Sequence, residues 1–180
     1  MNTTQLSVNP EKLINNLRFS FTQSTTVLGE LMQNARRAGA TFVSFEYVED
    51  TRTLTVRDDG CGIACLETLL TVAESGWDIE LIEREHAFGI GFLSALFSCE
   101  AISVDSKCGR FSVDTAALLA FQPIVIEPAD WQGITRLTLT QFKPEADRIE
   151  SQLRRLARGF PIEVSFNGAS LDRPRAIAMR

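Results

Sequence analysis

Hydrophobic and polar positions follow two periods along this chain, and each period predicts a different kind of element. Helical spacing of apolar residues predicts a short helix after Pro10, a helix over 26–38 that Gly39 closes, one that starts near Gly91, and one over 145–158. Runs rich in β-branched and aromatic residues predict strands over 41–48, 53–57, 101–105, 109–113, 123–127, 133–141 and 162–166. This mixture of helices and strands is typical of an α+β protein.

Short polar turns join several of the expected strands. Residues 49–52 separate the strands at 41–48 and 53–57, and residues 106–108 separate the next two, so we expect two hairpins. Hairpins imply antiparallel pairing. We therefore expect a two-layer α/β sandwich, with a mixed, mostly antiparallel sheet and the helices on one of its faces.

The composition is that of an ordinary globular chain. Of the 180 residues, 44% are hydrophobic and 23% are charged, which fits a single domain over 1–180 with a flexible polar tail at 1–10. The net charge of −5 argues against broad binding to nucleic acid or to an anionic membrane. The chain has no run of about 18 apolar residues and no signal-peptide pattern, so we expect a cytoplasmic location and no membrane partner.

The four cysteines, Cys61, Cys65, Cys99 and Cys108, have spacings that match no common zinc pattern. Free thiols in a reducing compartment are the favoured interpretation, and a zinc site is the alternative. The single histidine, His86, falls in an irregular stretch, which favours a solvated or packing position over a role as phosphoacceptor.

The helix over 26–38 carries the first candidate chemistry. Its flanking residues are apolar, yet Glu30 and Asn34 lie four positions apart and so share one face of the helix. Burying an acid is costly without a partner, and we expect that partner to be a hydrated Mg²⁺ ion on a nucleotide. The amide oxygen of Asn34 is a hard ligand suited to Mg²⁺. Glu30, one helical turn away, is placed to act as a general base toward water.

Two glycine motifs offer places where a ligand can approach the backbone. The first, Asp58-x-Gly60-x-Gly62, follows a predicted strand and forces a tight turn. In the second, Gly89 and Gly91 stand at the start of a helix. Successive backbone N–H groups at such a helix start form a site for phosphate oxygens.

In this order and spacing, the motifs resemble those of the GHKL family, whose ATP-binding domain has the Bergerat fold. The family includes DNA gyrase B subunits, the ninety-kilodalton heat-shock chaperone, sensor histidine kinases and mismatch-repair MutL. Residues 30–35 (ELMQNA), 58–63 (DDGCGI) and 88–95 (FGIGFLSA) resemble its first three boxes, and Thr135 lies where the fourth has a threonine. The resemblance covers most of the chain, from about residue 10 to residue 170.

The resemblance implies roles for these residues. It implies that Asp58 accepts a hydrogen bond from the amino group of adenine, and that Thr135 contacts adenine directly or through water. Asn34 would be the Mg²⁺ ligand, Glu30 the catalytic base and residues 64–88 the ATP lid. The other ATP-contacting positions that it implies are Gly60, Gly62, Ile63, Gly89, Ile90, Gly91 and Phe92.

We therefore expect a Mg²⁺-dependent ATP-binding domain that hydrolyses ATP slowly and works as a nucleotide-driven conformational switch of the chaperone or MutL type. A histidine-kinase-like catalytic domain and a nucleotide-binding module without turnover are the alternatives. Glu30 favours hydrolysis, because a kinase passes the phosphoryl group to a histidine rather than to water. The hydrolytic branches commonly take a phosphate-contacting lysine or arginine from a following domain, so we expect low activity from this chain alone. The family also implies a downstream domain or client protein and an ATP-dependent homodimer.

Overall fold

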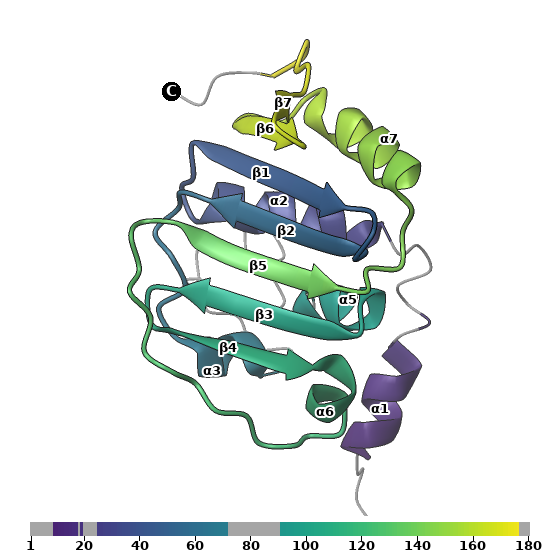
Figure 1. Ribbon diagram of the computed structural model, residues 1–180, viewed down its shortest axis with the longest axis vertical. Coiled ribbons are helices and arrows are strands. Elements are labelled where there is room, and N and C mark those ends of the chain that lie inside the picture. The colour runs from purple at the N-terminus through teal and green to yellow at the C-terminus, as the bar shows by residue number, and fades with distance from the viewer. Residues whose placement is uncertain (1–8, 18, 20–24, 72–90, 177–180) are drawn as a thin grey trace, which may run out of the picture.

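The computed structural model describes residues 9–17, 19, 25–71 and 91–176. In this part of the chain, one sheet is packed against helices (Figure 1). The strands are β1 (Phe42–Val48), β2 (Thr53–Asp58), β3 (Ala101–Ser106), β4 (Gly109–Asp114), β5 (Thr135–Thr140), β6 (Glu163–Phe166) and β7 (Ala169–Ser170). The helices are α1 (Pro10–Leu17), α2 (Thr26–Arg37), α3 (Leu66–Leu70), α5 (Gly91–Ser98), α6 (Thr115–Leu119) and α7 (Ala146–Ala157).

The seven strands of the sheet have the order β4-β3-β5-β2-β1-β6-β7. β1 and β6 are parallel, and all the other neighbours in the sheet are antiparallel. Figure 1 shows α2 and α5 behind the sheet, where they form the second layer. The expected α+β class and the mixed, mostly antiparallel sheet are therefore confirmed.

Most of the expected elements form where the sequence places them. The two hairpins are β1–β2 and β3–β4, and α7 covers most of the helix expected over 145–158. α5 begins at Gly91, as the glycine pair predicts. α2 ends before Gly39, whose φ of +72° is the left-handed conformation typical of a glycine that closes a helix.

One expected strand does not form. Residues 123–127 make only an isolated bridge to β4, between Glu127 and Arg110. Pro123 has no N–H to donate to a neighbour, and the side chain of Val125 is 78% exposed. The apolar run that predicted a strand therefore lacks a partner strand and a core surface to pack on. The short helix α6, which precedes this segment, was not expected.

The buried face of the sheet is built from rows of side chains, because every second residue of a strand points to the same side. Two rows, called here the apolar rows, have side chains that are each at most 8% exposed. The first contains Tyr47, Leu54, Leu139 and Ile102, and the second contains Phe166, Phe45, Val56, Leu137, Val104 and Phe111. The next row along the strands begins with Val43 but continues with Asp58, Thr135 and Ser106, whose hydroxyl is hydrogen-bonded to that of Thr135. These three polar residues are called the polar row.

Three helices supply the other half of the core. Their buried apolar residues are Val27, Leu28, Met32 and Ala35 of α2, Leu93, Ala95 and Leu96 of α5, and Ile149, Leu153 and Ala157 of α7. Glu30 and Asn34 are only partly buried, so they lie at the edge of this apolar contact rather than inside it. Among the described residues, none of the helices has the length and apolar character needed to cross a membrane.

Candidate functional site

The polar row brings together two residues that are far apart in the sequence. Asp58 ends β2 and Thr135 begins β5, and the two are directly paired across these antiparallel strands. Paired positions have side chains on the same face with Cβ atoms about 4.5–5.5 Å apart. The carboxylate and the hydroxyl expected to contact adenine are therefore neighbours at one end of the buried face, and both are partly open to solvent.

Asp58 has one oxygen committed to its own turn and one that is available. The backbone N–H of Gly60 donates to Asp58 Oδ1 over 3.0 Å. Within the described part of the chain, Asp58 Oδ2 has no hydrogen-bond partner. Burial raises the pKa of Asp58 above its ordinary value of 3.8; the Gly60 hydrogen bond opposes this, and the charge of Asp59 adds to it. A partly buried acceptor of this kind is suited to a ligand that donates a hydrogen bond.

The neighbouring acid, Asp59, has a structural role. Its carboxylate accepts hydrogen bonds from the backbone N–H and the hydroxyl of Thr41 and from the backbone N–H of Phe42. Burial alone would raise the pKa of Asp59, but these hydrogen bonds lower it below its ordinary value. Asp59 therefore ties the turn after β2 to the start of β1, whereas Asp58 remains available.

Both glycines of the turn are packed against the protein itself. A Cβ atom on Gly60 would lie 2.6 Å from the Cβ of Ala38, and the N–H of Cys61 donates to the carbonyl oxygen of Ala38 over 2.9 Å. A Cβ atom on Gly62, where φ is +76°, would lie 2.9 Å from both Lys107 and Trp131. These close approaches fix the turn between the end of α2 and the β3–β4 hairpin.

Trp131 forms a wall beside this turn. The ammonium group of Lys107 lies 5.9 Å from the centre of the Trp131 ring, within the range of a cation–π contact. The indole Nε1 is buried and has no hydrogen-bond partner among the described residues. Together, Lys107 and Trp131 cover one side of Gly62.

Glu30 of α2 lies against the start of α5. A Cβ atom on Gly91 would be only 2.5 Å from Glu30 Oε2, so the glycine leaves the space that the carboxylate occupies. A carboxylate next to the first turn of a helix is favourable, because the unpaired N–H groups there carry partial positive charge. Within the described residues, Glu30 has no hydrogen bond or ion pair with another side chain. It is therefore free to act on water or on a hydrated cation.

Asn34 lies one turn after Glu30 on α2. Arg37 Nη1 is 3.4 Å from Asn34 Oδ1, at the long limit of a hydrogen bond. Among the described residues, no three His, Cys, Asp or Glu side chains gather closely enough to hold a metal ion. A Mg²⁺ ion here would thus need phosphate oxygens and water to complete its shell around the single amide ligand, which is how Mg²⁺ is commonly bound with nucleotides.

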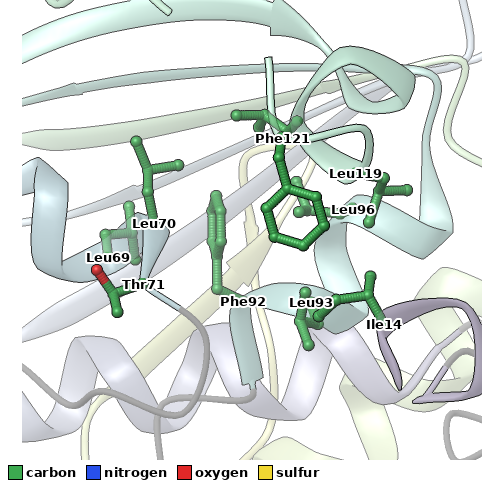
Figure 2. A pocket seen from close by; sticks show the side chains of 10 residues that line it. Ile14, Leu69, Leu70, Thr71, Phe92, Leu93, Leu96, Leu119 and Phe121 are labelled. Carbon is green, nitrogen blue, oxygen red and sulfur yellow. The ribbon is translucent and has the colours of Figure 1, made fainter. Parts of the chain in front are cut away.

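Phe92 has a different environment from the rest of the expected site. Its side chain lines an apolar pocket together with Leu70, Leu96 and Phe121 (Figure 2). This pocket lies between α1, α3, α5, α6 and the segment after α6. Several expected features lie outside the described residues, namely Gly89, Ile90, positions 72–88 of the lid and positions 1–8 of the tail.

Sequence reasoning missed two residues that complete this end of the molecule. Ser106 lies in the polar row and is fully buried, and its hydroxyl is hydrogen-bonded to Thr135 and to the backbone of Ile63. The alternation Ile102, Val104, Ser106 places it on the buried face, so the pattern contained this signal. Trp131 lies in an irregular loop, where no periodicity marks it.

No family model matches this chain, and no curated protein matches it. Its fold is α+β, and its candidate site lies at one end of the buried face of a mixed sheet, where the partly buried Asp58 carboxylate and Thr135 hydroxyl are neighbours. A second carboxylate, Glu30, abuts the start of a neighbouring helix.

Proposed function

We propose that this chain is an ATP-binding domain of the GHKL type with the Bergerat fold, which binds ATP with Mg²⁺ and hydrolyses it slowly. The observation that carries the proposal is the pairing of Asp58 with Thr135 at the open end of the buried face. Motif order in the sequence supports the same assignment. The pairing joins the second and fourth motifs, although 76 residues separate them between positions 58 and 135.

The base would bind at the polar row. Asp58 Oδ2 would accept a hydrogen bond from the exocyclic amino group of adenine, and the Thr135 hydroxyl is its neighbour. The wall made by Lys107 and Trp131 lies beside the Gly62 turn. A flat, apolar ring with a few polar atoms at one edge matches such a surface.

The phosphates would lie toward α2 and the first turn of α5. The N–H groups at the start of α5 would donate to phosphate oxygens. Asn34 would offer its amide oxygen to Mg²⁺, and the bound ion would supply charge neutralisation at the phosphates. Glu30 would accept a proton from the water that attacks the terminal phosphorus, with ADP as the leaving group. Slow turnover and a nucleotide-driven switch of the chaperone or MutL type follow from the family resemblance.

The test is a calorimetric titration of ATP with Mg²⁺, combined with a measurement of ADP release. The native protein is expected to bind. Asp58→Asn is expected to weaken binding by about 10- to 150-fold, the range for losing a hydrogen bond to a charged group. Glu30→Ala is expected to bind ATP normally but to release ADP about 10²- to 10⁴-fold more slowly, the range for loss of a general base.

Asp59→Asn is the matched control for the base site, because Asp59 is the adjacent acid but is tied to Thr41 and Phe42. It should bind ATP like the native protein. Equal binding by the native protein and Asp58→Asn would refute the adenine assignment. An unchanged rate in Glu30→Ala would refute the assigned base, and binding without any ADP release would identify a nucleotide-binding module without turnover.

A further inference from the structure

The hydroxyl of Ser106 is at the centre of a short hydrogen-bond chain. Ser106 is fully buried at the end of β3. The backbone N–H of Ile63, in the turn after β2, donates to Ser106 Oγ over 2.8 Å. Ser106 Oγ is also 2.9 Å from Thr135 Oγ1. Ser106 thus connects the Asp58 turn to the first residue of β5.

The direction of the second hydrogen bond follows from counting donors. A hydroxyl group has one hydrogen to donate. If Thr135 donated to Ser106, the Ser106 hydrogen would be buried without an acceptor among the described residues, which is costly. Ser106 therefore donates to Thr135 Oγ1. Thr135 is partly exposed, and its hydroxyl hydrogen is then available to donate into the polar row.

We propose that Ser106 is a positioning residue that makes Thr135 a hydrogen-bond donor in the base site, so that the site selects adenine over 6-oxopurines. The proposal rests on the proposed function. Adenine presents an amino donor beside a ring-nitrogen acceptor, which matches an acceptor at Asp58 and a donor at Thr135. Hypoxanthine and guanine present a carbonyl acceptor beside an N–H donor, so both contacts would be mismatched.

The test compares the dissociation constants of ATP and ITP, whose bases differ only at this edge. The native protein is expected to prefer ATP. In Ser106→Ala, the Thr135 hydroxyl can rotate and accept a hydrogen bond as well as donate one. The preference for ATP over ITP is therefore expected to fall about 10-fold. Loss of the hydrogen bond to Ile63 alone would weaken the binding of ATP and of ITP equally, so the ratio of their dissociation constants would not change. Ser98→Ala is the matched control, because it removes another buried hydroxyl, one bonded to Ala95 in α5.

A double-mutant cycle shows whether Ser106 acts through Thr135. In a Thr135→Val background, Ser106→Ala should leave the ATP-to-ITP ratio unchanged. Ser106→Cys keeps a small side chain with a weaker donor, so its preference should lie between those of Ser106→Ala and the native protein. It also provides the measurement if Ser106→Ala does not fold.

Two outcomes would overturn the inference alone while the native protein still binds ATP. One is an unchanged ratio in both Ser106 variants, and the other is an equal fall in Ser98→Ala. Failure of the native protein to bind ATP would overturn the proposed function and this inference together.

Discussion

The two ends of the buried sheet face are made by the same strands but differ in chemistry. At one end, Leu54 of β2 pairs with Leu139 of β5, and both side chains are fully buried. Four residues further along β2, Asp58 pairs with Thr135 and both are partly exposed. The first end supplies stability, because it removes apolar surface from water. The second end exposes a carboxylate and a hydroxyl at a cost in stability, which is typical of a binding site.

The largest expected effect tests the apolar end. Leu54→Ala removes a fully buried side chain from a central strand, so the free energy of unfolding should fall by about 2–5 kcal/mol. Leu54 is about 13 Å along the strand from Asp58, so the affinity of the native fraction for ATP should change by no more than about twofold. Urea unfolding and calorimetry measure the two quantities. A large loss of affinity in folded protein would show that the two ends are not independent.

The next effect concerns the contact between Glu30 and α5. In Gly91→Ala, the new methyl group would occupy the space of Glu30 Oε2, so the carboxylate must move. A general base misplaced by about 1 Å can cost about 10²-fold in rate. We therefore expect ADP release to slow by about 10- to 100-fold.

Gly29→Ala is the matched control for that variant. Its new methyl group would meet only Leu156, at an ordinary distance of 3.7 Å. Because alanine has a higher helix propensity than glycine, the free energy of unfolding should rise by about 0.5–1 kcal/mol. The rate of ADP release should not change. Equal slowing in both variants would mean that the space at Gly91 has no special relation to Glu30.

A smaller effect tests the cost of the polar end. Because burial raises the pKa of Asp58 above 3.8, the folded protein binds this proton more tightly than the unfolded chain does. The bound proton therefore contributes to stability at low pH. This contribution is lost as the pH rises from 3.8 through the raised pKa of Asp58. Asparagine does not ionise, so Asp58→Asn does not lose stability in this way as the pH rises. Its free energy of unfolding at neutral pH should exceed that of the native protein by on the order of 0.5–1 kcal/mol.

Asp59→Asn should show the opposite sign. The pKa of Asp59 is lowered, so its contribution to stability is present above 3.8 and is lost as the pH falls through the lowered value. This variant should be less stable than the native protein at neutral pH. Urea unfolding of both variants between pH 3 and about pH 8 gives the comparison. The same sign for both would contradict the different roles assigned to these two acids.

Much of this arrangement follows from local patterns in the sequence. Periodicity predicts α2, α7 and both hairpins, and the glycine at position 39 predicts where α2 ends. The same reasoning was wrong for residues 123–127, because a strand needs a partner as well as an apolar run. Whether a neighbouring strand is available depends on the whole sheet.

The candidate site depends more heavily on long-range register. The motifs identify Asp58 and Thr135 separately, but their pairing requires β5 to insert between β2 and β3. The role of Ser106 depends on the same register, since it reaches Thr135 only because β3 also pairs with β5. Alternation places a serine on the buried face without indicating which residue it contacts. Trp131 has no periodic pattern at all, and only tertiary packing brings it to Gly62.

The cysteines give the mildest test of the same contrast between the two ends. Cys61, Cys65 and Cys108 are exposed and lie after β2 and in the β3–β4 turn, near the polar row. Cys99 is buried before β3, at the apolar end, and burial raises the pKa of its thiol to about 12.

The thiolate is the reactive form of cysteine, so Cys99 should resist a chromogenic disulfide reagent at pH 8 on account of both its pKa and its access. Native protein should therefore show three rapidly reacting thiols and denatured protein four. Cys99→Ala should keep the three rapid thiols and lose only the slow one. Rapid reaction of Cys99 in native protein would show that the apolar end opens as readily as the polar end. That result would contradict the buried packing of Cys99.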